Sequence, residues 1–224
     1  MPKVLLVIGD AAEATDTLYP YFRVQEDGYR CVVAAPEKRI YHLVLHDPHP
    51  DWDITVESAG YRLASDIAFR DVVASEYLGL VITGGRAPEY LRYDEDLMRL
   101  TRHFFAANKP VGVVCHGIEI VAAADVIREK RVTTVRKCRY DAERAGGKYV
   151  DQPVVVDGNL VSARTFWDNA PWMRQFMLRL NAARVHLHTA GNSLNGFDYS
   201  ALDAQSVLAG MAAEIQALSN ADLH

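Results

Sequence analysis

Cysteine is scarce in this chain of 224 residues: there are three, and no two have the Cys-x-x-Cys spacing of a redox motif or a zinc ribbon. A small, odd number disfavours a disulfide framework and favours a reducing compartment, so we expect a cytoplasmic protein. Positive charge is also limited, because 24 Lys and Arg stand against 29 Asp and Glu and the net charge is −5. This balance argues against nucleic acid as a partner.

Long hydrophobic runs are missing as well. The first strand-like stretch, Val4 to Ile8, is too short for a signal sequence or a membrane span, so we expect no membrane partner. Half of the residues are nonetheless hydrophobic and 24% are charged, which is typical of a globular domain with a sizeable core.

Short apolar, β-branched runs alternate with helical patterns along most of the chain. Apolar strands that alternate with helices indicate parallel strands covered on both faces. We therefore predict an α/β fold: a flavodoxin-like, doubly wound, mostly parallel sheet with helices on both faces, in a three-layer sandwich. The predicted strands are 4–8, 29–34, 78–82, 110–114, 132–134, 154–156 and 160–163, and the helices are 14–27, 94–107, 118–127 and 170–180.

Two segments depart from this alternation. Residues 39–61 contain Pro48, Pro50 and several histidines, and we predict an inserted loop or small hairpin there. Beyond the predicted α/β domain, residues 1–183, the segment 184–224 begins with turn formers and ends in an apolar-periodic stretch. We predict an appendage with a helix from Leu208 to Leu218 that packs on the core or on a second subunit.

The stretch VGVVCHGIEIVAAA places Cys115 between a predicted buried strand and a helix, with Gly112 and Gly117 on either side. Small residues relieve crowding where a nucleophile is held in a strained turn. The N–H groups that begin the helix favour the thiolate, lower its pKa and suit an oxyanion of the substrate. The alternative is an inert buried cysteine.

Four stretches together resemble the PfpI/ThiJ superfamily of intracellular proteases, glutathione-independent glyoxalases and deglycases, from Lys3 to about Leu180. They are KVLLVIGDAAEATDTLYPYFRVQEDGYRCVVAAP, LVITGGRAPEYLR, VGVVCHGIEIVAAAD and VVVDGNLVSARTFWDNAPWMRQFM. The region LHDPHPDWDITVESAGY resembles the long-form, glyoxalase-like branch.

The resemblance implies a role for each matching residue. Cys115 matches the nucleophile, His116 the residue beside it, and Glu13 a glutamate that points at the sulfur. Glu89 matches an acid that reaches across a subunit interface to orient the histidine. Gly84 and Gly85 match the family loop whose backbone faces the cysteine.

Each of these residues also has a structural interpretation. From the residues alone, a desolvated Glu13 would stay protonated beside a thiolate and shuttle a proton, or it would be a helix-start charge. His116 could be a hydrogen-bonded structural histidine, and Glu89 an ordinary turn residue after Pro88.

The chain departs from the family where a substrate would bind. Glu119 follows Cys-His-Gly-Ile, where the family often has Pro-Gln, and Val135-Arg136-Lys137 replaces a tyrosine-containing pattern. We take Glu119, Arg136 and Trp167 as candidate substrate-binding residues. The basic run formed by Arg136, Lys137, Arg139 and Arg144 is otherwise a solvated face.

We expect neither a metal nor a cofactor. The residues His42, His46, His49, Asp47, Asp51 and Asp53 have ligand-like spacing, but prolines interrupt them. His186 and His188 alternate as in a strand and are weak ligand candidates. No phosphate loop or dinucleotide motif is present.

These features favour a small-molecule enzyme in which the Cys115 thiolate attacks an electrophilic carbon. The long-form resemblance implies glyoxalase-like conversion of a 2-oxoaldehyde, and a homo-oligomer. Amide hydrolysis, an isonitrile-hydratase-like reaction, or a redox-sensing, stress-protective role of an oxidisable Cys115 remain alternatives.

Overall fold

The computed structural model describes residues 1–189, 191 and 193–221 of the chain. At its centre is a seven-stranded sheet with the order β10-β11-β7-β6-β1-β2-β5, in which every neighbouring pair is parallel except β10 with β11. The strands are β1 (Lys3–Val7), β2 (Arg30–Ala35), β5 (Ile67–Ala68), β6 (Tyr77–Ile82), β7 (Val111–Val114), β10 (Val154–Asp157) and β11 (Leu160–Ala163).

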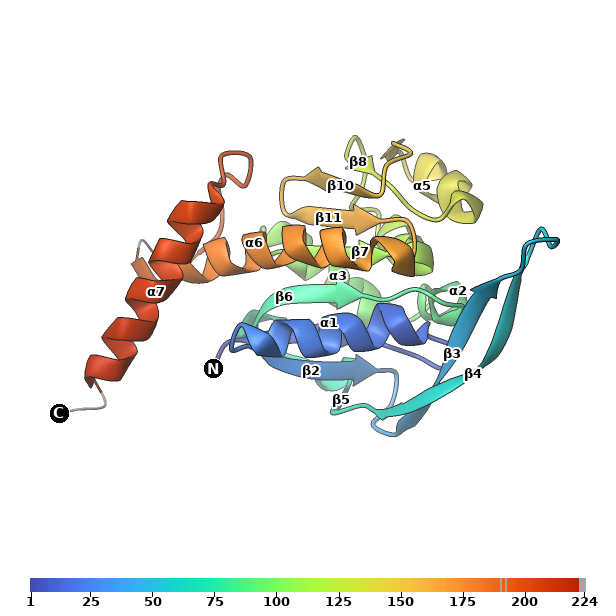
Figure 1. The fold of residues 1–224 in the computed structure, drawn as a ribbon, viewed down its shortest axis with the longest axis horizontal. Helices are drawn as coiled ribbons and strands as arrows, with labels where there is room; N and C mark the ends of the chain where they lie inside the picture. The colour runs from blue at the N-terminus through green and yellow to red at the C-terminus, as the bar shows by residue number, and fades with distance from the viewer. Residues whose placement is uncertain (190, 192, 222–224) are drawn as a thin grey trace.

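Helices cover both faces of this sheet (Figure 1). The helices α1 (Ala14–Glu26) and α6 (Asn169–Thr189) lie side by side on one face, and α3 (Glu95–Ala106) lies on the other beside α4 (Ile118–Ala123). The predicted flavodoxin-like α/β sandwich is confirmed. Strands β6 and β7 are buried throughout because both faces of the sheet carry helices, which explains their unbroken apolar sequence.

The close packing of α6 on the sheet depends on a strand residue without a side chain. Phe176 and Trp172 are fully buried under β7, and a Cβ at Gly112 would lie 3.0 Å from the Phe176 ring. Glycine at this position lets the two aromatic rings approach the backbone, so the core fills without a void.

The segment predicted as an inserted loop or small hairpin is a long two-stranded ribbon. It consists of β3 (Ile40–Pro48) and β4 (Thr55–Ala64), pairs antiparallel, and extends beyond the carboxyl ends of the parallel strands (Figure 1). The ribbon therefore runs three residues past the predicted end at 61. A second small sheet joins β8 (Arg131–Val132) to β9 (Lys148–Tyr149), so the predicted strand 132–134 is not in the central sheet.

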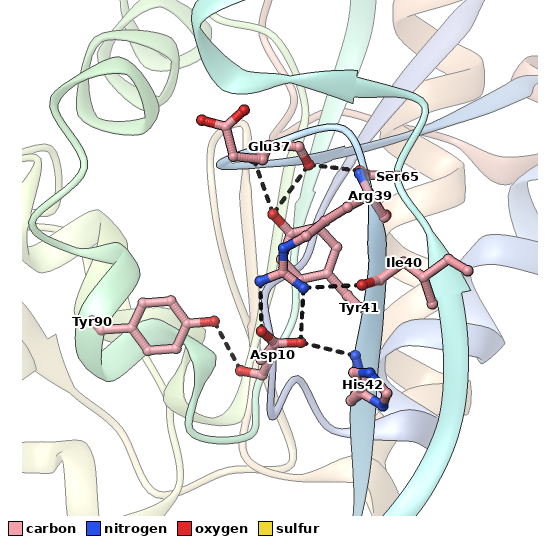
Figure 2. Close-up of polar contacts among 8 residues, drawn as sticks. All are labelled: Asp10, Glu37, Arg39, Ile40, Tyr41, His42, Ser65 and Tyr90. Atoms are coloured by element: carbon pink, nitrogen blue, oxygen red, sulfur yellow. Dashed lines mark hydrogen bonds and ion pairs between the residues drawn. The ribbon is translucent and has the colours of Figure 1, made fainter.

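Polar contacts at the base of the ribbon fix its direction (Figure 2). The Asp10 carboxylate, at the end of β1, accepts hydrogen bonds from the Arg39 guanidinium at 2.6 Å and from the His42 backbone N–H at 3.0 Å. The Tyr90 hydroxyl donates to the Asp10 carbonyl at 2.9 Å and so ties the short helix α2 (Ala87–Leu91) to the same point. Behind it, Ser65 donates to the Glu37 carbonyl at 2.8 Å. Strand β1, the ribbon and α2 thus meet at one residue.

Helix α6 continues without a break to Thr189, across the domain boundary predicted at 183/184. Arg184 lies within that helix and forms a half-buried ion pair at 2.9 Å with Glu214 of α7 (Ala204–Ala221). Helix α7 is longer than the predicted 208–218 and packs against the end of α6, opposite the ribbon (Figure 1). His186 and His188 are helical rather than extended. No helix among the described residues is long and apolar enough to cross a membrane.

Candidate active site

Cys115 occupies a left-handed backbone conformation, with a φ of 56°, directly after β7. A short 3₁₀ turn, Cys115–Gly117, then leads into α4. The turn fits because Gly117 has no side chain: a Cβ there would lie 2.9 Å from the Ile82 carbonyl oxygen. The Thr134 hydroxyl donates to the Cys115 carbonyl at 2.7 Å and holds the turn from the other side. The strained backbone directs the Cys115 side chain into a pocket.

The electrostatic environment of the Cys115 thiol differs from the sequence-based expectation. Backbone N–H groups of His116 and Gly85 reach the sulfur and favour the thiolate, as predicted. Burial is the larger influence and, with the carboxyl of Asp16, it raises the pKa of Cys115 above the ordinary value. Burial therefore opposes the lowered pKa that the sequence analysis expects, and this geometry favours the thiol over the thiolate.

Asp16, which the sequence analysis missed, supplies the carboxyl group beside Cys115. It lies in the first turn of α1 and is completely buried. A Cβ at Gly84 would be 2.6 Å from Asp16 Oδ2 and 3.2 Å from Cys115 Sγ, so both groups border the space that this glycine leaves free. Asp16 Oδ1 accepts a hydrogen bond from Asn169 at 3.3 Å, whereas Oδ2 has no partner among the described residues. Burial and the nearby Glu13 raise the pKa of Asp16 well above its usual value, which favours the protonated acid.

Glu13 has a different place from the one that the resemblance implies. It is the N-cap of α1, and its Oε2 accepts the Asp16 backbone N–H at 2.6 Å. Burial raises the pKa of Glu13 as predicted, but its influence on the Cys115 thiol is smaller than that of Asp16. Glu13 therefore orients the first turn of α1 and, through it, Asp16. Residues three apart lie on the same side of a helix, so the spacing from Glu13 to Asp16 could have predicted a second acid on the side that faces Cys115.

His116 is oriented by a carboxylate of its own chain. Its Nδ1 lies 2.9 Å from Oε1 of Glu119, whose side chain is 6% exposed. Glu119 thus faces away from solvent and does not line the pocket, although it was a candidate for substrate binding. The same Oε1 accepts a hydrogen bond from the Cys138 thiol at 3.3 Å, and Arg92 lies 3.3 Å from Oε2.

The pocket over Cys115 has a volume of about 500 Å³ and lies between the ribbon, the loop after β6 and the segment after β11. Lys137 and Trp167 line it, whereas the predicted Arg136 does not. Glu89 also lines the pocket, and within the described chain its carboxylate forms no hydrogen bond or ion pair. The lining residues are His46, Pro48, Thr55, Glu57, Arg86, Glu89, Cys115, His116, Val135, Lys137, Thr165, Phe166 and Trp167. A cavity of about 550 Å³ elsewhere in the molecule has no cysteine in its wall.

Charges at the pocket rim are largely paired. Arg86 forms a bidentate ion pair with Glu57, with Nε 2.7 Å from Oε2, and His46 lies 2.9 Å from the same oxygen. Hydrogen bonding to Arg86 lowers the pKa of Glu57 to about 2. Among the described residues, the one hydrogen-bond partner of Lys137 is the Thr55 hydroxyl, at 3.4 Å, and no carboxylate pairs with its positive charge at the pocket.

Three ligand-type side chains lie close together beneath the pocket. The donor atoms of His116, Glu119 and Cys138 are within 4.8 Å of one another, the one such group in the described chain. They already hydrogen-bond to one another, and Arg92 adds a positive charge 3.3 Å from Glu119. This arrangement fits a hydrogen-bond network better than a divalent cation. In the ribbon, His46 pairs with Glu57 rather than with the other predicted ligands.

Taken together, the strand-to-helix turn, its pocket-lining cysteine and the adjacent buried acid form one site on a flavodoxin-like sheet. The family model of the DJ-1/PfpI family matches residues 2–179, and the chain belongs to that family.

Relatives and solved structures extend this comparison. The chain is 35% identical to "Deglycase PfpI" of Pyrococcus furiosus over 175 residues, which cover 78% of this chain and 97% of the relative. It is 39% identical to "Protein/nucleic acid deglycase 2" of Escherichia coli over 119 residues, covering 53% and 69%. DJ-1 of Schizosaccharomyces pombe has the same fold, with a TM-score of 0.62 at 17% identity over 92% of this chain and 96% of that chain.

Alkylation distinguishes the three thiols. We expect iodoacetamide to modify Cys115 first, because Cys115 lines a pocket and two backbone N–H groups reach its sulfur. Cys138 is only 2% exposed. Cys31 lies in β2, and burial raises its pKa to about 12. Because the pKa of Cys115 is raised, its rate should climb about tenfold per pH unit without a plateau below pH 9. Mass spectrometry locates the label, with Cys115→Ser as the control. Preferential labelling of Cys31 or Cys138 would contradict the assignment.

Proposed function

We propose that the chain is a cysteine-dependent enzyme that converts a reactive carbonyl compound, in a glyoxalase- or deglycase-type reaction. The observation that carries this proposal is the position of the Cys115 sulfur, between the buried Asp16 carboxyl and the N–H groups of Gly85 and His116. A nucleophile, a proton donor and a polarising pair of N–H groups suit addition to an aldehyde. The names of the relatives as deglycases agree with carbonyl chemistry.

The first step forms a bond between Cys115 Sγ and the aldehyde carbon of the substrate. The thiol proton passes to His116, the carbonyl π electrons move to oxygen, and protonated Asp16 supplies the proton that makes the hemithioacetal hydroxyl. The N–H groups of Gly85 and His116 stabilise the oxygen while it carries negative charge.

Rearrangement of the hemithioacetal needs no external oxidant. For a 2-oxoaldehyde, the Asp16 carboxylate removes the hydrogen from C1, and the electrons pass through the carbon–carbon bond to the C2 oxygen, which takes the proton from His116. The enediol is then protonated at C2 while its C1 hydroxyl loses a proton, which leaves a thioester. Water cleaves the thioester and restores the Cys115 thiol. The net reaction of methylglyoxal with water is the formation of lactate.

Lactate formation from methylglyoxal tests this function directly. We expect the full-length chain to release lactate without added glutathione, and Cys115→Ser to abolish the reaction because an alcohol of much higher pKa replaces the thiol. An enzymatic lactate assay measures both. Consumption of methylglyoxal without lactate, or activity retained in Cys115→Ser, would refute the proposed reaction.

The identity of the acid is tested by a matched pair of amide substitutions. Asp16→Asn should lower kcat roughly a hundredfold or more, because asparagine has no carboxyl proton to transfer. Glu13→Gln should lower kcat less, since glutamine keeps an oxygen that accepts the Asp16 N–H. Steady-state kinetics with circular dichroism as the fold control decides between them. A larger loss in Glu13→Gln would restore the role that the sequence analysis gave to Glu13.

We also propose that the chain forms a homo-oligomer, as expected from the sequence. Support comes from the prevalence of closed symmetric assemblies, from the unpaired Glu89 carboxylate at the pocket, and from Leu208 of α7, which is 64% exposed. Light scattering at micromolar concentration should give a mass at least twice the 25.0 kDa of one chain. A mass near one chain would refute the oligomer and any role of Glu89 across subunits.

A further inference from the structure

The carboxylate of Glu119 lies beneath the catalytic pocket, where no substrate can reach it. It belongs to the first turn of α4, three residues after His116, and this spacing brings the two side chains to the same side of the turn. Glu119 Oε1 is 2.9 Å from His116 Nδ1, and the Glu119 side chain is only 6% exposed. A carboxylate without solvent interacts with an imidazole more strongly than an exposed one does.

Two further side chains hold Glu119 in place. The Cys138 thiol donates to Oε1 at 3.3 Å, and the Arg92 guanidinium lies 3.3 Å from Oε2, held in turn by Asp141 at 3.2 Å. Burial works against ionisation of Glu119, but the hydrogen bonds from His116 and Cys138 and the charge of Arg92 outweigh it and lower the pKa of Glu119. Burial also raises the pKa of Cys138, so that Cys138 stays a thiol and a hydrogen-bond donor.

Glu89, unlike Glu119, is not held in place by neighbouring side chains that the structure describes. The Glu89 side chain is exposed at the pocket, on the short helix α2, and in the described chain nothing fixes its carboxylate through a hydrogen bond or an ion pair. Within the described chain, the carboxylate that reaches His116 Nδ1 is therefore that of Glu119 and not that of Glu89.

We propose that Glu119, fixed by Arg92 and Cys138, is the positioning residue for His116, and that it makes a contribution from a second subunit unnecessary. An ionised carboxylate only accepts hydrogen bonds, so Glu119 selects the tautomer of neutral His116 with the proton on Nδ1. His116 Nε2 is then left unprotonated and free to take the Cys115 proton. The catalytic consequence rests on the proposed function, whereas the tautomer does not.

The tautomer of His116 is the direct measurement. The full-length protein is labelled with ¹⁵N-histidine, and its imidazole nitrogen shifts are recorded at alkaline pH, where histidine is neutral. The His116 signals are identified by their loss in His116→Gln. We expect the Nδ1–H tautomer in the wild-type protein and also in Glu89→Gln.

Glu119→Gln should change this tautomer. One amide oxygen cannot face both the Arg92 cation and His116, and turning the amide NH₂ toward Arg92 is the costlier choice. The NH₂ group should then face His116 Nδ1 and shift the ring to the Nε2–H form. With methylglyoxal, kcat should fall roughly ten- to a hundredfold with little change in KM. Glu143→Gln, an exposed glutamate that pairs with Arg139, is the control and should keep wild-type kinetics.

Several results would overturn the proposal. They are an Nε2–H tautomer in the wild-type protein, an unchanged tautomer in Glu119→Gln, or a tautomer shift in Glu89→Gln. The proposed function fails separately, if the wild-type protein makes no lactate, and the tautomer measurement then still decides the role of Glu119. Cys138→Ser, which keeps a donor, should retain the wild-type tautomer and so separates loss of positioning from loss of the fold.

Discussion

The left-handed backbone of Cys115 is the constraint on which the site depends. A residue with a side chain in this conformation is strained, with a cost of about 1–3 kcal/mol, and it persists only where its surroundings leave no alternative. Here strand β7 fixes the residue before it and α4 the residues after it. The requirement extends to the neighbouring loop: Gly84 must be a glycine because a Cβ there would collide with Cys115 and Asp16. The glycines around the site therefore make room for the strained backbone conformation of Cys115.

The Cys115 thiol and the Asp16 carboxyl are two buried acidic groups that border the same space, the one that Gly84 leaves free. Burial raises the pKa of both the Cys115 thiol and the Asp16 carboxyl, and each would disfavour the negative charge of the other. Burial and proximity therefore favour the uncharged form of both groups. In the proposed reaction the thiol proton needs a base; of the two histidines that line the pocket, His46 is paired with Glu57, whereas His116 directly follows Cys115. Transfer of this proton during the proposed addition would keep the buried negative charge transient.

Much of this fold could be predicted from the sequence because its signals are local. Unbroken apolar strands indicate a parallel sheet, Asp157-Gly158 marks the β10–β11 turn, and Gly-Val-Val-Cys-His-Gly marks the elbow. The extent of α6 was missed because Arg184, His186 and His188 resemble a linker. All three residues are helical, and Arg184 pairs with Glu214 of α7, thirty residues later.

The acids of the site were harder to predict, for a geometric reason. Glu13 and Asp16 are both near the end of β1, and only the direction of the first turn of α1 decides which one meets the sulfur. The Glu13 side chain caps α1 by accepting the Asp16 N–H, so the side chain beside Cys115 is that of Asp16. Glu119 was read as a pocket residue because its partners Arg92 and Cys138 come from distant segments. The sequence shows that these carboxylates are present, but it does not show in which direction their side chains point.

The ribbon is anchored near the end of β1 and also forms part of the pocket wall. Its base is fixed at Asp10 (Figure 2). Its far part supplies His46 and Glu57 to the pocket wall. Because Glu57 neutralises Arg86, Lys137 remains at the rim as a cation with no carboxylate partner in the part of the chain that the structure describes. The ribbon thus controls which positive charge a substrate meets, although it contributes no reacting group. Variation in this segment can change substrate preference while the strained cysteine, its acid and its histidine stay as they are, since those groups are held by the sheet and α4.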